Sequence, residues 1–124
     1  MNPADLFAHE TSTTSLAPGD TLFNAGEPGD AMFVLLEGAM DVVVGDQVVE
    51  HSTRGAVLGE MALIDHSPRG ATVLAREPSR LVKIDQRRFM YLIQQNPFFA
   101  THVMKVLADR IRHMNQLPAR KSKA

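Results

Sequence analysis

Short β-rich runs separated by turn residues are the feature that most limits how this chain can fold. Two Pro-Gly-Asp tripeptides, at residues 18–20 and 28–30, each precede an apolar pair. A proline with a fixed φ followed by a flexible glycine turns a chain into a new strand. Gly45-Asp46 links two valine runs and is typical of a hairpin turn. Because such turns recur at intervals of roughly ten residues between residues 13 and 84, they predict a β-sandwich or barrel.

The residues between the turns locate the strands and the point where the sheets end. Runs of β-branched and large apolar residues predict strands at residues 32–37, 40–44, 47–49, 71–75 and 80–84. From Gln86 the apolar residues recur at helical spacing instead. Asn96-Pro97 separates this helix from a second one, which should run from about Pro97 to about Gln116. The expected fold is therefore mainly β with flanking helices.

The second predicted helix carries an apolar stripe at spacings of three or four residues. The stripe consists of Phe99, Val103, Val106, Leu107, Ile111 and Met114. Two interpretations stay open and are compatible: the stripe packs against its own domain, or it forms a helix-to-helix contact in a homodimer. We expect a single domain over residues 1–117 and a basic, flexible tail over residues 118–124.

The composition suits one globular core and excludes several kinds of site. The chain has 124 residues, of which 44% are hydrophobic. It contains no cysteine, which excludes disulfides, thiolate catalysis, zinc fingers and iron–sulfur clusters. A net charge of −1 argues against a large nucleic-acid footprint. Since neither a run of ~18 apolar residues nor a signal-peptide pattern is present, we expect a cytoplasmic protein without a membrane span.

Residues 54–75 combine features that suit an anion. Gly59 permits close backbone approach, and the following Glu60-Met61-Ala62-Leu63 can form one helical turn whose first N–H groups lack internal partners. Such N–H groups and the positive end of the helix dipole attract a phosphate. Arg69 can supply a charged and bidentate partner from the other side. The segment therefore predicts a phosphate site.

Glu60 needs a donor of its own, because a phosphate repels a nearby carboxylate. A ribose hydroxyl is a suitable donor, and dinucleotide sites divide the work in the same way between an acid and backbone N–H groups. A compact ligand that carries both a phosphate and a ribose is a nucleotide, and compactness favours a cyclic one.

This stretch also resembles a known family. Gly59-Glu60-Met61-Ala62-Leu63, then five residues, then Arg69-Gly70-Ala71-Thr72-Val73 is similar to the phosphate-binding cassette of cyclic nucleotide-binding domains. Catabolite activator proteins, protein kinase A regulatory subunits and cyclic-nucleotide-gated channels contain such domains. The likeness extends over residues 16–116 and implies an eight-stranded jelly-roll barrel with helices at its ends.

The resemblance also implies how a ligand is held. Glu60 would bind the ribose 2′-hydroxyl and Arg69 the cyclic phosphate, while the backbone N–H groups of Met61, Ala62 and Ala71 would complete the phosphate cradle. Gly70 follows the arginine, where a threonine is associated in the family with the guanine base. Because Gly70 offers no hydroxyl, the resemblance favours cAMP over cGMP.

Three further residues have two interpretations each. Val49 and Val57 are either apolar neighbours of the base or sugar, or ordinary core residues. Arg110 matches a position from which some family members cap the base, and it is otherwise a solvated arginine on the helix surface. The candidate ligand-binding residues are Val57, Gly59, Glu60, Met61, Ala62, Arg69, Gly70, Ala71 and Arg110.

The sequence does not favour an enzyme or a DNA-binding protein. The five histidines show no metal-ligand spacing, and no nucleophile-elbow pattern is present. Because only residues 118–124 follow the last predicted helix in this sequence, we expect no helix-turn-helix after it.

Two hypotheses remain. In the first, the chain is a stand-alone sensor that binds a cyclic nucleotide. Binding rearranges its C-terminal helices, and this change alters a contact with a second copy of the chain or with an effector protein. In the second, it is an interaction module of the same fold without a physiological ligand. Glu60 and Arg69 favour the sensor, because an unliganded, partly buried arginine has no obvious structural use.

Overall fold

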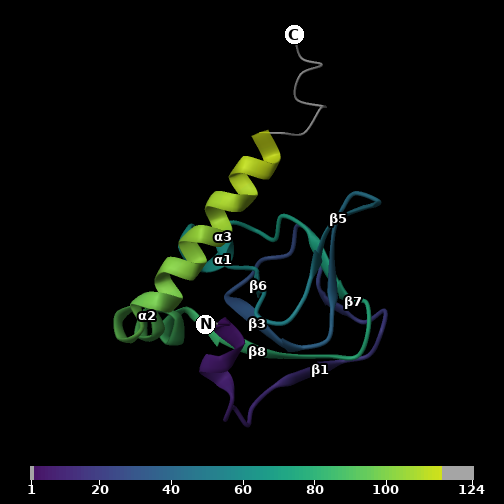
Figure 1. Ribbon diagram of the computed structural model, residues 1–124. Helices are drawn as coiled ribbons and strands as arrows, with labels where there is room; N and C mark the ends of the chain where they lie inside the picture. The colour runs from purple at the N-terminus through teal and green to yellow at the C-terminus, as the bar shows by residue number, and fades with distance from the viewer. Residues whose placement is uncertain (1, 116–124) are drawn as a thin grey trace.

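The computed structural model describes residues 2–115, which form a β-barrel with helices to one side (Figure 1). In order, the elements are η1 (Pro3–Phe7, a 3₁₀ helix), β1 (Thr14–Leu16), β2 (Thr21–Phe23), β3 (Ala31–Glu37), β4 (Met40–Val44), β5 (Gln47–Ser52), β6 (Val57–Leu58), α1 (Met61–Ile64), β7 (Thr72–Ala75), β8 (Ser79–Asp85), α2 (Gln86–Gln95) and α3 (Pro97–Asn115). The predicted tail, the predicted helix end at Gln116 and the side chain of Met114 lie outside the described residues.

The strands of the described chain form two four-stranded antiparallel sheets. One sheet has the order β1-β8-β3-β6, and the other has the order β2-β7-β4-β5. Strands distant in sequence are neighbours in both sheets, as in a jelly roll, since Val34 of β3 lies opposite Val82 of β8 and Val42 of β4 lies opposite Val73 of β7. The prediction of a mainly β fold with eight strands and C-terminal helices is confirmed. β5 continues to Ser52, three residues past the predicted strand end.

β3 joins the two hydrophobic cores because it is apolar on both faces. Its first six residues are all buried. Phe33 and Leu35 point between the two sheets, where Met40 of β4 and Leu81 of β8 meet them. The alternate residues, Met32, Val34 and Leu36, pack with the helices in a second core. A continuous apolar run of this length is typical of a strand covered on both sides.

The two C-terminal helices begin where their capping residues predict. The Asp85 carboxylate accepts a hydrogen bond from the N–H of Arg88 (2.9 Å), and the Asn96 side chain accepts one from the N–H of Phe99 (3.2 Å). Pro97 is the first residue of α3, a position that needs no backbone donor. Both helix starts are therefore determined by residues next to them in the sequence.

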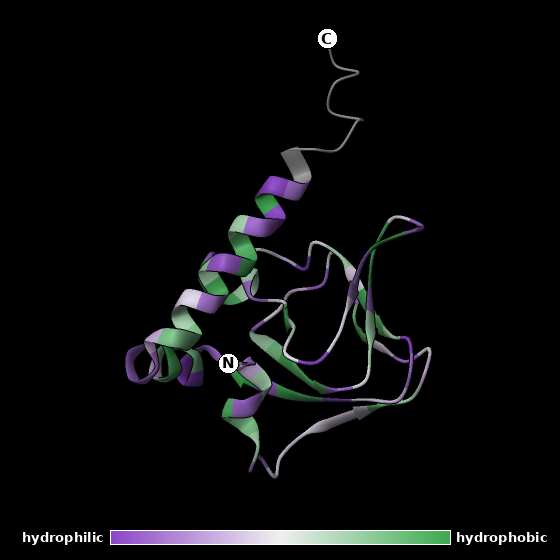
Figure 2. Cartoon of the chain, in the orientation of Figure 1, coloured by the Kyte–Doolittle hydropathy of each residue, from purple (hydrophilic) through white to green (hydrophobic). Residues whose placement is uncertain are grey.

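The apolar stripe of α3 packs against the core along only part of its length. Phe99 and Val103 are buried in the core shared with β3, and Leu107 packs against that core. Ile111, one turn further on, is 59% exposed. Hydrophobic and hydrophilic bands alternate along α3 in Figure 2. The first half of the stripe thus packs against its own domain, and Ile111 is left on the surface.

The N-terminal residues fold against the helices, which the sequence reasoning did not anticipate. Ala4 and Phe7 of η1 are buried in the same core as Phe99. The guanidinium of Arg88 lies 5.3 Å from the Phe7 ring centroid and forms an ion pair with Glu10 (2.7 Å). η1 is therefore tied to the start of α2.

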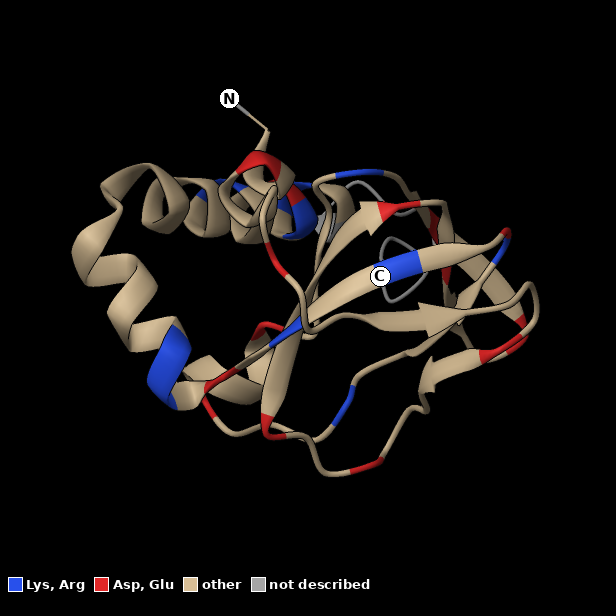
Figure 3. Cartoon of the chain, turned by 90° about the horizontal axis from the view of Figure 1, so that it is seen from below, with Lys and Arg blue, Asp and Glu red and all other residues tan. Residues whose placement is uncertain are grey.

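Charged residues are dispersed along the strands, loops and helices of the described chain (Figure 3). Among residues 2–115, no helix has the length and apolar composition that a bilayer crossing requires.

Candidate functional site

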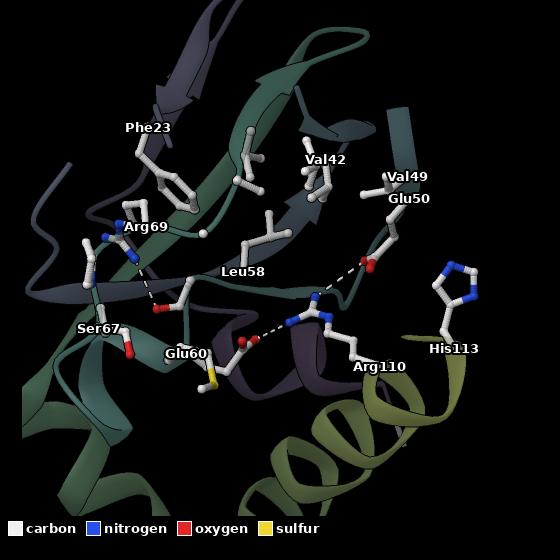
Figure 4. A pocket seen from close by; sticks show the side chains of 18 of the residues that line it. Phe23, Val42, Val49, Glu50, Leu58, Glu60, Ser67, Arg69, Arg110 and His113 are labelled. Carbon is white, nitrogen blue, oxygen red and sulfur yellow. Dashed lines mark hydrogen bonds and ion pairs between the residues drawn. The ribbon is translucent and has the colours of Figure 1, made fainter. Parts of the chain in front are cut away.

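A pocket of about 540 Å³ opens between the β2-β7-β4-β5 sheet, the cassette around α1, and the second half of α3. Its lining residues are Phe23, Val42, Val44, Val49, Glu50, Leu58, Gly59, Glu60, Met61, Ala62, Ser67, Pro68, Arg69, Gly70, Ala71, Val73, Asp109, Arg110 and His113. Figure 4 shows Arg69 at one side of the pocket and Glu50, Arg110 and His113 at the other. Apolar side chains lie between these polar ends.

Arg69 is held in a fixed position at the first end. Its Nη1 donates to the Gly59 carbonyl (3.0 Å), and its Nη2 donates to the Ala31 carbonyl (2.8 Å). Its Cζ lies 4.1 Å from the ring centroid of Phe23, a cation–π distance. Only 8% of Arg69 is exposed. The expectation that this arginine has no structural use without a ligand is wrong, because it joins β3, the cassette and β2.

One nitrogen of the Arg69 guanidinium nevertheless has no hydrogen-bond partner among the described residues. This nitrogen is Nε, and it is buried. Burial lowers the pKa of Arg69, and the negative charges of Asp30, Glu27 and Glu60 partly offset this effect. A buried, charged donor without a partner is costly, so it favours an acceptor at this place.

Two glycines make room for the Arg69 side chain. A Cβ at Gly29 or at Gly59 would clash with the guanidinium, and Gly59 also has a φ of +78° that disfavours other residues. The close approach expected at Gly59 is therefore observed, with Arg69 as the neighbour.

The cassette presents backbone N–H groups near this arginine. The N–H of Ala62 makes a long bond to the Gly59 carbonyl (3.4 Å). The N–H groups of Met61, Gly70 and Ala71 make no hydrogen bond within the described part of the chain. α1 begins at Met61, and Ala71 precedes β7, so these donors stand at the ends of two elements. Met61, Ala62 and Ala71 are the residues whose N–H groups the resemblance implies for a phosphate.

The loop between α1 and Arg69 is shaped by Asp65. Its Oδ1 accepts bonds from the Ser67 N–H (3.0 Å) and the Ser67 hydroxyl (2.5 Å). These bonds from Ser67 lower the pKa of Asp65. His66, between them, adopts a left-handed φ of 59°. The turn that carries Ser67 and Arg69 to the pocket is thus locally stabilised.

Glu60 and Arg110 form an ion pair between the cassette and α3. Arg110 Nη1 donates to Glu60 Oε1 (2.5 Å), while its Nη2 donates to the Val57 carbonyl (3.1 Å) and to Glu50 Oε2 (3.4 Å). Glu60 is only 2% exposed. Burial by itself would lower the pKa of Arg110, but the Glu60 and Glu50 carboxylates raise it overall. The interpretation of Arg110 as a solvated arginine on the helix surface is wrong.

Val57 is the one candidate whose side chain the structure places outside this pocket. It lies opposite Val34 in the β3–β6 pairing and is buried in the core that packs on the helices. Because side chains alternate along a strand, its neighbour Leu58 points the other way and lines the pocket. Val57 takes part only through its carbonyl, which accepts from Arg110. The alternative interpretation of Val57, core packing, is the one observed.

The other candidates all line the pocket, and so does Val49. Sequence reasoning missed the apolar wall of Phe23, Val42, Val44 and Val73, and the polar residues Glu50, Asp109 and His113. The alternation of Val42 and Val44 along β4 was a usable signal. No local signal marks Glu50, because its place depends on strand register. Among residues 2–115, no group of three or more histidines and acids is arranged to hold a metal ion.

Comparison with known proteins agrees with this fold and pocket. The family model described as "Cyclic nucleotide-binding domain" matches residues 13–96. The chain belongs to the cyclic nucleotide-binding domain family.

Curated relatives extend beyond this chain. It is 30% identical over 88 residues to a cAMP-dependent protein kinase regulatory subunit of Colletotrichum orbiculare, covering 69% of this chain and 22% of the relative. It is 28% identical to the cAMP-activated global transcriptional regulator CRP of Pasteurella multocida, covering 77% and 49%. A cyclic nucleotide-gated potassium channel of Mesorhizobium japonicum is 36% identical, with coverage of 74% and 25%. The chain thus spans less than half the length of each of these relatives.

Solved structures show the same fold. The catabolite activator protein of Thermus thermophilus superposes with a TM-score of 0.74 at 23% identity, covering 89% of this chain and 59% of that chain. A second structure, described as "A cyclic-GMP-dependent signalling pathway regulates bacterial phytopathogenesis", gives a TM-score of 0.73 at 26% identity and covers 88% and 90%.

Proposed function

We propose that this chain is a non-catalytic sensor domain of the cytoplasm that binds cAMP in the pocket between the cassette and α3. The observation that carries the proposal is the meeting of Arg69, whose buried Nε has no hydrogen-bond partner among the described residues, with Met61 and Ala71, whose N–H groups are also unpartnered there, in the lining of one pocket. Together these donors suit a phosphate.

The rest of the pocket suits a nucleoside. Glu60 is an acceptor-only group within the cassette and can accept from a ribose hydroxyl. The apolar side chains of Val42, Val49 and Leu58 give a purine a surface to pack on. Gly70 adds no hydroxyl that would favour guanine, and two of the relatives carry cAMP in their names. One structural neighbour is described with cyclic GMP, so the test includes both nucleotides.

The Arg110–Glu60 pair gives binding a route to α3. A ribose hydroxyl that bonds to Glu60 shares the carboxylate that holds Arg110 in this structure. Ligand binding would then change how α3 packs against the barrel, which is a shift between two populations. Each tenfold change in that equilibrium needs ~1.4 kcal/mol of differential binding.

The output would be a contact made by α3, with a second copy or an effector protein. Met104 and Ile111 are large apolar residues of α3 that are 61% and 59% exposed. If α3 forms a homodimer under ligand control, sedimentation velocity across protein concentration will differ between free and cAMP-saturated protein. Equal sedimentation in both states would exclude the ligand-controlled dimer.

Titration calorimetry with cAMP and with cGMP tests the binding proposal. Wild-type protein should bind cAMP more tightly than cGMP. Arg69→Gln should weaken the binding of cAMP by about tenfold to a hundredfold, because a hydrogen bond from a charged group is lost. Arg80→Gln is the matched control, since within residues 2–115 the Arg80 side chain pairs only with the exposed Glu37. Tighter binding of cGMP would overturn the choice of cAMP.

The interaction module without a ligand is the second candidate. It is favoured by the carbonyl partners of Arg69 and by the Arg110–Glu60 pair, because both charges have protein partners without a nucleotide. Absence of heat and of any thermal shift with either nucleotide, in wild type as in Arg69→Gln, would select this candidate.

A further inference from the structure

A β-bulge in the β4–β5 hairpin determines which side chains of β5 enter the pocket. Val43 lies opposite Val48, but Val42 lies opposite Glu50, so Val49 is an extra residue on β5. In a regular hairpin Val42 would face Val49, and Glu50 would take the next place and point to the other side of the sheet. The bulge instead puts both Val49 and Glu50 on the pocket side with Val42.

Glu50 is therefore a carboxylate inserted into an otherwise apolar wall. It comes from the sheet, and Figure 4 shows it on the side of the pocket away from Arg69. A ligand whose phosphate lies at Arg69 would direct its base toward Glu50.

The Glu50 carboxylate is fixed through one of its two oxygens. Oε2 accepts from the Ser52 hydroxyl (3.0 Å) and from Arg110 Nη2 (3.4 Å). Within residues 2–115, Oε1 makes no hydrogen bond. The carboxylate is half-buried, with 36% of its side chain exposed. It is thus an oriented acceptor with spare capacity, and it matches a ligand donor.

The other polar side chains at this end are less suited to that role. Asp109 Oδ1 already accepts from Arg112 (2.6 Å), and both side chains of that pair are more than half exposed. His113 is exposed as well. Arg110 is engaged by Glu60, Glu50 and the Val57 carbonyl.

We propose that Glu50 reads the edge of the ligand base and selects a base that presents an amino group there. This inference rests on the proposed function. A carboxylate accepts hydrogen bonds and cannot donate them, so it favours the 6-amino group of adenine. It disfavours the 6-keto oxygen of guanine or hypoxanthine at the same place, because two acceptors would face each other.

Cyclic AMP and cyclic IMP test this role because they differ only at the base edge, where the 6-amino group and unprotonated N1 of adenine are replaced by a 6-keto group and an N1–H. Their affinities, measured by calorimetry, should differ by about tenfold or more in wild-type protein, as expected for a hydrogen bond to a charged group. In Glu50→Gln the difference should shrink to about threefold or less, because an amide can both accept and donate.

Two further variants keep the test decisive. Glu37→Gln removes an exposed carboxylate of β3 and should leave the ratio unchanged. Glu50→Ala removes the acceptor altogether and should also shrink the difference; it serves if Glu50→Gln fails to fold, in which case an unchanged ratio in Glu50→Ala would overturn the inference.

The outcomes distinguish the inference from the proposed function. If Glu50 only positions Arg110, Glu50→Gln will weaken both nucleotides equally, and the unchanged ratio overturns the inference while binding remains established. Wild-type protein that binds both nucleotides equally also overturns it. Wild-type protein that binds no cyclic nucleotide overturns the proposed function and the inference together.

Discussion

The two ends of the pocket are built in different ways. At the first end, Arg69 is held by backbone carbonyls of Gly59 and Ala31 and by the face of Phe23. At the second end, Arg110 is held by two carboxylates that lie 50 and 60 residues away in the sequence. Backbone groups of a packed barrel move little, whereas an ion pair between a helix and a loop can open without unfolding the barrel. The first end is therefore preorganised, and the second is able to respond.

The largest expected effect comes from filling the space that Arg69 occupies. Gly59→Ala adds a Cβ that clashes with the guanidinium and also places alanine at a φ of +78°. We expect the free energy of unfolding to fall by about 3 kcal/mol, since left-handed strain costs about 1–2 kcal/mol and displacement of Arg69 adds to it. Urea denaturation measures this loss.

Gly45→Ala is the matched control for that substitution. Gly45 has a φ of +65°, and a Cβ there would meet nothing within 4 Å. It should lose about 1–2 kcal/mol from backbone strain alone. Equal losses in the two variants would show that the first end tolerates displacement of Arg69, contrary to a preorganised site.

Breaking the ion pair at the second end should have a somewhat smaller effect. Arg110→Gln leaves the buried Glu60 carboxylate without its cation and should cost about 2 kcal/mol. Hydrogen exchange should increase in the second half of α3, while the barrel strands keep their protection. Arg112→Gln is the control, because its exposed pair with Asp109 should contribute less than about 0.5 kcal/mol. Uniform loss of protection across the barrel would contradict a responsive second end.

Removing the aromatic face under Arg69 should have a smaller effect again. Phe23→Leu keeps an apolar side chain but loses the cation–π contact, which should cost about 1 kcal/mol and weaken nucleotide binding several-fold. Phe98→Leu, at a partly exposed position on α3, is the control. Unchanged nucleotide affinity in Phe23→Leu would mean that the carbonyl bonds alone orient Arg69.

The smallest expected effect concerns the loop that presents Ser67. The hydrogen bonds from Ser67 lower the pKa of Asp65 below its ordinary value of 3.8, so their stabilisation is present above that pH and is lost as the pH falls through the folded pKa. In Ser67→Ala the pKa should rise toward 3.8, as an NMR titration of the Asp65 carboxyl can measure. Ser15→Ala, at the exposed position of β1, should leave the pKa of Asp65 unchanged. No rise in Ser67→Ala would show that other groups set this pKa.

These contrasts also explain which site residues could be predicted. The cassette from Gly59 to Ala71 is contiguous, so its glycine, acid and arginine can be recognised from spacing alone, and the structure brings them to one pocket. The sequence leaves Val57 open between the site and the core, and strand alternation turns its side chain into the core.

The sequence by itself determined the elements and the Arg69 end of the pocket. Proline, glycine and capping residues act over a few positions, and they locate the turns and the starts of α2 and α3 wherever the chain folds. Only the tertiary structure decided the other end, where Glu50 and Arg110 lie. The bulge at Val49 depends on pairing between two strands, and the bond from Arg110 to Glu60 depends on how α3 lies against the barrel. Such long-range contacts leave no periodic pattern in the chain, because they arise only when separate elements pack together.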